Sequence, residues 1–310
     1  MSEIILHQYP ESPFSEKIRA ILGYKGLSYQ SVTIPVIMPK PDLMPLTGGY
    51  RKTPVMQIGA DIYCDSAIIA RAINHLHPQR NIFPAGQQAL EALAHWTDTF
   101  FFKCAVAVAF QPAAAGNNPL FNDPAAVQAF MADRAELSKG SQELAMDLSI
   151  AQPYFIQHLK RTDQQLAGSA FMAGSEPSIV DFSTYHCCWF VYGNPALKPL
   201  FEPFRQVTGW MERMAAFGHG EVTETEGSAA LEIARNSAPV TVAKAGTMDI
   251  DSFRPGDLVE VQPIDYGFNP VRGELLLASL EEIVIRRTDD QVGDVAVHFP
   301  RLGFRISAAS

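Results

Sequence analysis

The stretch from Tyr9 to Arg19, "YPESPFSEKIR", holds residues whose types and spacing could do chemistry. Ser12 and Ser15 enclose a Pro-Phe pair with the spacing of the C-x-x-C redox motif, but hydroxyl oxygens stand where both sulfurs would be. A hydroxyl does not ionise usefully near neutral pH, yet it can donate a hydrogen bond to an anion. The alternative interpretation is structural, because serine followed by proline is a typical N-cap with proline at the first helical position.

The other residue types that often carry chemistry are dispersed. The four cysteines, at 64, 104, 187 and 188, form no C-x-x-C pair, which indicates a reducing compartment and thiols used as small apolar side chains. The eight histidines form no metal-spaced group with acids or cysteines, so we expect no metal cofactor. A net charge of -9 disfavours nucleic acid as a partner, because phosphate binding needs a clustered positive surface.

The hydropathy pattern indicates a protein that is not embedded in a membrane. No apolar run approaches the roughly 20 residues of a membrane helix, and the first residues lack the basic and apolar regions of a signal peptide. We therefore expect a cytoplasmic protein without a membrane partner. At 310 residues the chain is long enough for two or three domains.

Residues 1–82 predict an α/β domain that would position the serine motif. "EIILHQY" is typical of a first strand, and "SEKIRAILGYKG" of an amphipathic helix that ends at Gly26. "SYQSVTIPV" follows as a β-branched strand, and "TPVMQI" and "IYCD" form a hairpin before the helix "SAIIARAINHLH". This order of elements predicts an α/β layer around a four-stranded sheet.

The period of the pattern changes twice in the rest of the chain. Residues 86–217 show helical periodicity alone and predict a helical bundle, and residues 218–238 predict an acidic, glycine-rich linker with a short helix at "SAALEIARN". From 239 to 310 the period is two, which predicts a small all-β barrel of SH3-like or OB-like type. This segment has seven Lys and Arg against eleven Asp and Glu, so even an OB-like barrel would bind nucleic acid poorly.

The ordered set of "SPFSEKIR", "KPDL", "TPV" and "CDS" resembles the glutathione transferase superfamily, and most of all its omega, zeta and related bacterial classes. The resemblance covers roughly residues 1–217 and leaves the last 70 or so outside the family pattern. It implies a thioredoxin-like N-terminal domain, an all-α C-terminal domain, glutathione as co-substrate and a homodimer. It also implies the activity, which is addition of the glutathione thiolate to an electrophilic small molecule in detoxification.

The resemblance also implies why the serine motif lacks sulfur, because a glutathione transferase brings in the sulfur with its co-substrate. Ser12 stands where omega enzymes carry cysteine and zeta enzymes carry serine, so its hydroxyl is the predicted donor to the bound thiolate. Phe14 belongs to the same predicted glutathione-binding turn. Tyr9 is the competing donor, since several other classes use a tyrosine at the end of this strand.

Two later motifs match the family's contacts to the peptide part of glutathione. Pro54 matches its cis-proline, which would turn the N–H and C=O of Thr53 toward the cysteinyl part. Asp65 and Ser66 match the pair that holds the γ-glutamyl end at a helix N-terminus, although either residue could be only a helix cap. The family usually has Glu or Gln where Asp65 stands, so Asp65 would reach less far.

Lys40 in "KPDL" matches an omega-like lysine that contacts the glycine carboxylate. Its structural alternative is an ordinary lysine in a flexible loop, and Arg51 and Lys52 are alternates for the same contact. These residues complete the predicted glutathione site.

In the helical region, Ser178 and Asp181 match the S-x-x-D capping box of the family, which is a folding element rather than a site. Trp96, Phe100 and Phe101 form an aromatic stripe on a helix that in the family faces the second-substrate pocket, and such a stripe is also typical of a core.

Two other functions stay open from the sequence. One is a binding or scaffold protein with this fold and no turnover, in which the C-terminal barrel is the functional part. The other is a glutathione-dependent lyase, isomerase or reductase, although a serine in place of the omega cysteine removes mixed-disulfide chemistry at that position. The sequence identifies neither the second substrate nor the role of the barrel.

Overall fold

The computed structural model describes residues 3–117, 123–142, 145–240 and 252–309. The chain forms two compact units, which we describe separately. The sheet unit consists of Met1–Ile18, Ser28–Ala72 and Glu221–Ser310, and the helical unit consists of Arg19–Leu27 and Ile73–Gly220.

The first four strands of the sheet unit form the predicted thioredoxin-like sheet. They are β1 (Ile4–Gln8), β2 (Ser28–Thr33), β3 (Val55–Ile58) and β4 (Asp61–Cys64). Strand β1 pairs in parallel with β2 and antiparallel with β3, and β3 pairs antiparallel with β4. All five residues of β1 are buried, which agrees with a central strand covered on both faces.

Four helices accompany these strands. They are α1 (Pro13–Lys25), the short α2 (Met44–Thr47), α3 (Ser66–Leu76) and α10 (Gly227–Arg235). Helices α1 and α3 start directly after β1 and β4, so the first turn of each carries a residue of the serine motif or of the Asp-Ser pair. Helix α10 confirms the short helix predicted at "SAALEIARN".

The C-terminal strands extend the same sheet. Strands β6 (Leu258–Pro263), β7 (Val271–Ala278), β8 (Glu282–Asp289), β9 (Gly293–Pro300) and β10 (Phe304–Ala308) belong to a ten-stranded sheet in the order β10-β6-β7-β8-β9-β4-β3-β1-β2-β5. We call residues 252–309 the C-terminal extension. Strand β9 pairs in parallel with β4, and Tyr63 lies opposite His298 in this register.

An SH3-like or OB-like barrel is therefore not confirmed. The period of two predicted the strands correctly. It does not indicate which strand pairs with which, and here β9 pairs with the edge of β4, more than 200 residues earlier in the chain. One apolar core runs through both parts of the sheet unit. It includes, from the two parts, Tyr50, Val55 and Ile62 and then Val297, Phe299 and Phe304.

The segment predicted as a linker contains the remaining strand. Strand β5 (Glu221–Glu224) pairs in parallel with β2 at the end of the sheet order, and all four of its residues are exposed. An edge strand that buries no side chain carries no alternating pattern, so the sequence could not indicate it. The domain limits of 1–82, 86–217 and 239–310 stay predictions.

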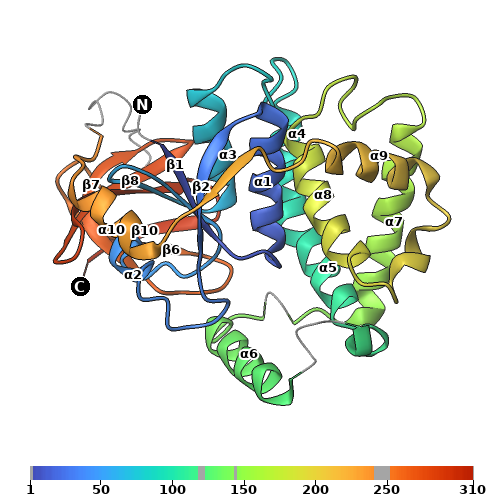
Figure 1. Cartoon of the computed structure of the whole chain (residues 1–310), viewed down its shortest axis with the longest axis horizontal. Helices are drawn as coiled ribbons and strands as arrows, with labels where there is room; N and C mark the ends of the chain where they lie inside the picture. Colours follow the sequence, from blue (N-terminus) through green and yellow to red (C-terminus); the bar gives the residue numbers. More distant parts are fainter. Residues whose placement is uncertain (1–2, 118–122, 143–144, 241–251, 310) are drawn as a thin grey trace. The chain divides into compact units, whose positions relative to one another are not determined.

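The helical unit is built from the predicted run of helices. They are α4 (Ala89–Trp96), a π-helical turn η1 (Thr97–Phe101), α5 (Phe102–Ala109), α6 (Pro124–Leu137), α7 (Leu148–Leu166), α8 (Ile179–Tyr192) and α9 (Arg205–Ala215), with two short 3-10 helices η2 (Pro112–Asn117) and η4 (Lys198–Phe201). Helix α5 packs against α7 and α8, and α9 packs against the same two helices (Figure 1).

Helix α8 begins with the predicted capping box. The backbone N–H of Ser178 donates to Oδ2 of Asp181 at 2.9 Å. Asp181 is buried and also accepts from the indole N–H of Trp210 at 3.0 Å. This interaction confirms the capping box and ties the start of α8 to α9.

Candidate functional site

Ser12 lies at the N-terminus of α1 and is almost completely buried, with 2% exposure. Its Oγ accepts a hydrogen bond from the backbone N–H of Ser15 at 3.2 Å, so it serves as an N-cap. A hydroxyl has two lone pairs and one hydrogen, so this bond leaves the hydrogen for donation. Capping and donation to a ligand are therefore compatible in the same side chain.

The neighbours of Ser12 differ in what they offer. Oγ of Ser15 is buried and has no hydrogen-bond partner among the described residues. Phe14 is half-buried in the first turn of α1. Tyr9 is half-buried after β1, and the ammonium of Lys40 lies 5.8 Å from the centroid of its ring.

Thr53 and Pro54 lie just before β3 and are joined by a cis peptide bond, as the family resemblance implies. The ammonium of Lys40 donates to Oγ1 of Thr53 at 3.1 Å and to the backbone oxygen of Arg51 at 3.2 Å. Lys40 is 3% exposed, so it is not an ordinary lysine of a flexible loop. It holds the chain that carries Thr53.

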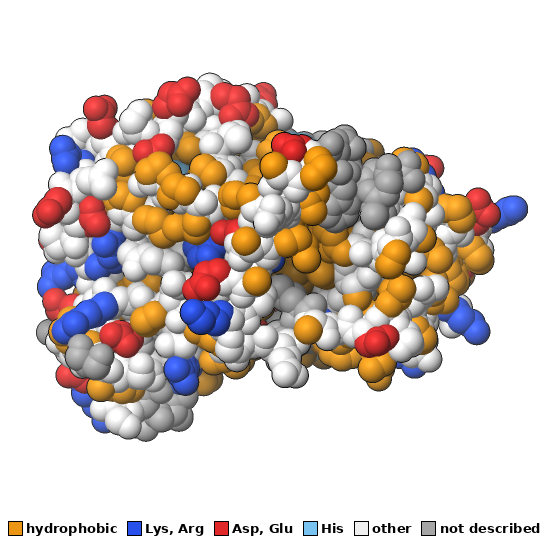
Figure 2. Space-filling view, turned by 90° about the horizontal axis from the view of Figure 1, so that it is seen from below, with side chains coloured by type: hydrophobic (Ala, Val, Ile, Leu, Met, Phe, Trp, Pro, Cys, Tyr) orange, Lys and Arg blue, Asp and Glu red, His pale blue; other side chains and the backbone are white. Residues whose placement is uncertain are grey.

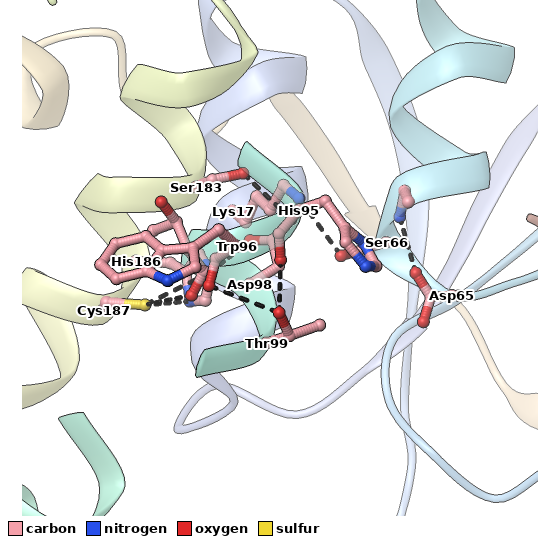
Figure 3. A network of polar contacts seen from close by, with 12 residues as sticks. Lys17, Asp65, Ser66, His95, Trp96, Asp98, Thr99, Ser183, His186 and Cys187 are labelled. Carbon is pink, nitrogen blue, oxygen red and sulfur yellow. Dashed lines mark hydrogen bonds and ion pairs between the residues drawn. The ribbon is translucent and has the colours of Figure 1, made fainter. Parts of the chain in front are cut away.

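Asp65 and Ser66 connect β4 to α3. Asp65 has a φ of 105°, which non-glycine residues rarely adopt, and its Oδ1 accepts from the backbone N–H of Ala67 at 2.8 Å. Ser66 is buried in the first turn of α3, and its Oγ lies 3.4 Å from the ammonium of Lys17 (Figure 3). Both members of the pair thus contribute to the start of the helix.

Lys17 is a residue of this site that the sequence did not indicate. It is fully buried in α1, one turn after Ser12. In "SEKIR" it occupies a polar position of an amphipathic helix, where a solvent-exposed lysine would give the same pattern. An ammonium in an apolar interior is costly unless oxygen atoms surround it, so its place next to Ser66 suits an anion.

The site contains hydroxyl and ammonium donors but no reactive thiol. Burial raises the pKa of the Cys64 thiol well above its ordinary value, and the charge of Asp65 adds to this effect. Burial also raises the pKa of Cys104 to about 11. All four cysteines are buried and none forms a disulfide, so we expect the thiol for sulfur chemistry at this site to come from a ligand.

The contacts of the sheet unit join some of the predicted residues and leave others separate. Lys40 contacts Thr53, and Asp65 and Ser66 are consecutive. In the described part of the chain, Ser12 makes no hydrogen bond to Thr53 or Ser66. A ligand that reaches all three could connect them.

A cavity of about 600 Å³ lies beside Lys40, at the end of β2 and the start of α10. Its lining includes three carboxylates, those of Asp42, Glu224 and Glu226, but none of the predicted residues other than Lys40. Because acidic side chains repel an anionic peptide, this cavity is unsuited to the carboxylates of glutathione.

A second group of polar side chains lies in the helical unit and was also missed. In η1, the carboxylate of Asp98 accepts from the hydroxyl of Ser183 at 3.0 Å and lies 3.0 Å from Nε2 of His186 (Figure 3). His186 is fully buried. π-Helical turns are rare and often occur at functional sites, and this one directs Asp98 toward α8. The aromatic stripe predicted nearby stacks partly on itself, since Trp96 lies 5.9 Å from Phe101, which is buried.

The described residues offer no metal site and no membrane-spanning helix. Among the ranges that the structure describes, no group of three or more His, Cys, Asp or Glu side chains could hold a metal ion. No described helix is both long and apolar enough to cross a membrane. On the face drawn in Figure 2, the coloured Lys and Arg side chains are scattered among acidic and apolar ones.

The chain is similar to known proteins in sequence and in fold. A family model described as "Glutathione S-transferase, N-terminal domain" matches residues 6–81. A GST-like protein of known structure from Pseudomonas syringae is 39% identical, with 100% of each chain covered and a TM-score of 0.84. No curated protein matches the chain.

Two more distant structures show the fold alone. Glutathione S-transferase III in its apo form is 19% identical, covers 69% of this chain and 92% of its own, and has a TM-score of 0.50. A glutathione S-transferase from Rhodospirillum rubrum is 16% identical, with 69% and 88% covered and a TM-score of 0.50.

Proposed function

This chain belongs to the glutathione S-transferase superfamily, and from that premise we propose that it is a glutathione transferase that adds the glutathione thiolate to an electrophilic small molecule. The observation that carries the proposal is the geometry of Ser12. Its oxygen accepts from Ser15, which leaves its hydrogen to donate to a thiolate, and the N-terminus of the 13-residue α1 favours an anion there.

In the proposed reaction, glutathione loses its thiol proton to solvent and binds as the thiolate. The sulfur then forms a bond to the electrophilic carbon while a leaving group departs with its bonding electrons, or the electrons move into a conjugated acceptor. The hydroxyl of Ser12 stabilises the thiolate and keeps the sulfur oriented. Ser12 itself forms no covalent bond to glutathione or to the electrophile.

The rest of the sheet unit binds the peptide. We assign the cysteinyl part to the backbone of Thr53 before Pro54, and the γ-glutamyl carboxylate to Ser66 and the first amides of α3. Asp65 assists at the ammonium group of the ligand. Phe14 packs beside the tripeptide. Lys40 holds Thr53 and supplies positive charge for the glycine carboxylate, and Lys17 lies beside Ser66.

Calorimetric titration with glutathione, followed by conjugation assays on a panel of electrophiles, tests the proposal. We expect binding at millimolar or lower ligand and turnover of at least one electrophile. Absence of both heat and thermal shift at millimolar glutathione would contradict it. Binding without any turnover would support instead a binding or scaffold protein. Turnover confined to a lyase reaction, isomerisation or disulfide reduction would support the other glutathione-dependent activities.

We further propose a cytoplasmic homodimer that acts in detoxification, on the ground of family membership. Sedimentation velocity of the purified protein tests the assembly. A single 34.0 kDa species across micromolar concentrations would reject the dimer.

A further inference from the structure

The residue before Thr53 is held by two residues of the C-terminal extension. The ammonium of Lys52 lies 2.6 Å from Oδ1 of Asp265 and 3.9 Å from the centroid of the Tyr266 ring. Asp265 and Tyr266 lie between β6 and β7. A 2.6 Å ion pair combined with a cation over an aromatic ring restrains the lysine in two directions.

The environment makes this contact more than an ordinary surface ion pair. The side chain of Lys52 is 13% exposed, and that of Asp265 is 34% exposed. The backbone N–H of Tyr266 donates to the same Oδ1 at 2.7 Å, which fixes the carboxylate that receives Lys52. A pair with two partly buried partners and a fixed acceptor loses less to solvent and to side-chain entropy than an exposed pair does.

Neighbouring contacts fasten the same stretch of chain. Tyr50 is 3% exposed and lies 6.2 Å from the ring of Phe299 and 6.2 Å from that of Phe304, both in the extension. On the other side, Lys40 binds Thr53 itself. The segment 50–53 is thus held at Tyr50 and Lys52 by the extension and at Thr53 by Lys40.

We propose that Asp265 and Tyr266 are positioning residues for glutathione, acting through Lys52 to hold the backbone of Thr53. This inference rests on the proposed function, in which Thr53 contacts the cysteinyl part of the ligand. Under this proposal the C-terminal extension contributes to glutathione binding. Lys52 then supports the loop that carries Thr53 and does not bind the glycine carboxylate.

The test measures glutathione affinity in full-length variants, each of which removes a contact between Lys52 and Asp265 or Tyr266. Asp265→Asn, Tyr266→Leu and Lys52→Met should each raise the dissociation constant for glutathione about tenfold, as the loss of one coupled contact does. The double variant Lys52→Met with Asp265→Asn should bind glutathione as well as whichever of the two single variants has the lower affinity, because both changes remove the same contact. Lys52→Arg keeps the charge and can stack on Tyr266, so it should lose less affinity than Lys52→Met.

The matched control is Glu274→Gln. It breaks another ion pair of 2.6 Å within the extension, between Glu274 and Arg286, which joins β7 to β8. Among the described residues, neither partner forms a hydrogen bond or ion pair with a predicted site residue. We expect it to leave glutathione affinity unchanged. By calorimetry, the melting temperatures of all variants should lie within about 3 °C of wild type. A variant that only destabilises the fold would lower the melting temperature instead of the affinity for glutathione.

The outcomes separate this inference from its premise. If wild type binds glutathione and the Asp265 and Tyr266 variants bind it equally well, the inference is wrong and the proposed function stands. An equal loss of affinity in Glu274→Gln also overturns it, because the effect would then be general to the extension. A wild-type protein that binds no glutathione overturns the proposed function and this inference with it.

Discussion

The ammonium of Lys17 lies 3.4 Å from the hydroxyl oxygen of Ser66, although the two residues are 49 positions apart. Lys17 is fully buried and Ser66 is 5% exposed. The contact places a positive charge at the first turn of α3, where amide groups already favour an anion. Under the proposed function, Lys17 therefore complements the γ-glutamyl carboxylate and orients the hydroxyl that binds it.

Replacing Lys17 with methionine should weaken glutathione binding about tenfold, because it removes the charge and keeps the length of the side chain. Titration calorimetry measures the effect. The variant also removes the donor to the buried hydroxyl of Ser66, so the melting temperature should fall, and binding is compared well below it. Lys17→Arg serves as the control and should retain most of the affinity. Unchanged binding by Lys17→Met would remove Lys17 from the site.

Ser12→Ala should lower kcat for conjugation about a hundredfold and change the dissociation constant of glutathione much less. One donor directed at a developing anion contributes on the order of 2–4 kcal/mol to catalysis. Steady-state kinetics at neutral pH measures the split. The variant also loses an N-cap, which costs about 1 kcal/mol of stability, so assays belong well below the melting temperature.

Ser15→Ala is the matched control for that experiment. Its hydroxyl is buried without a partner, so its removal should leave both activity and stability near wild type. Tyr9→Phe should also remain active. A fully active Ser12→Ala together with an inactive Tyr9→Phe would identify Tyr9 as the donor instead.

The sequence predicted those parts of the fold that depend on local patterns. The hairpin of β3 and β4 follows from two apolar runs around Gly59, and α8 follows from the capping box at Ser178. The pairing of β9 with β4 could not be predicted, because any strand with a period of two could fill that edge.

The candidate site divides in the same way. Ser12, Thr53 and Ser66 belong to short motifs whose spacing can be read directly. Lys17 and Asp98 acquire their partners only through the packing of helices, and a polar residue on an amphipathic helix gives the same pattern whether it faces solvent or a buried partner.

Truncation after residue 238, which removes the C-terminal extension, should yield a protein that aggregates or melts far below the full chain. The cut would expose the edge of β4 and the apolar face that Val297 and Phe299 cover. In the intact chain, Phe299→Ala should lower the free energy of unfolding by about 3–5 kcal/mol in urea titration. A truncated protein that is soluble and binds glutathione would support a separate domain at 239–310.

The stability of the pairing between β4 and β9 should depend on pH through His298. This ring is 3% exposed, with Nδ1 2.6 Å from Oε1 of Glu282 and Nε2 3.2 Å from Oδ1 of Asp61. It stacks on Tyr63 at 4.4 Å. Burial lowers the pKa of His298, but the hydrogen bonds and charges of the two carboxylates outweigh it and raise the pKa above the ordinary value of 6.5.

A pKa raised by folding means that the folded state binds the proton more tightly than the unfolded chain does. The stability from His298 should therefore be complete below about pH 6.5 and disappear as the pH rises through the folded pKa. Urea titration of wild type and His298→Gln across this range measures it, and the two unfolding free energies should converge as the pH increases. A constant offset between wild type and His298→Gln at every pH would show that the imidazolium contributes no charge-dependent stability to the pairing of β4 with β9.

His158 should show the opposite trend. Burial lowers its pKa to about 4, so His158→Gln should relieve instability at acid pH, and the same urea titration measures it.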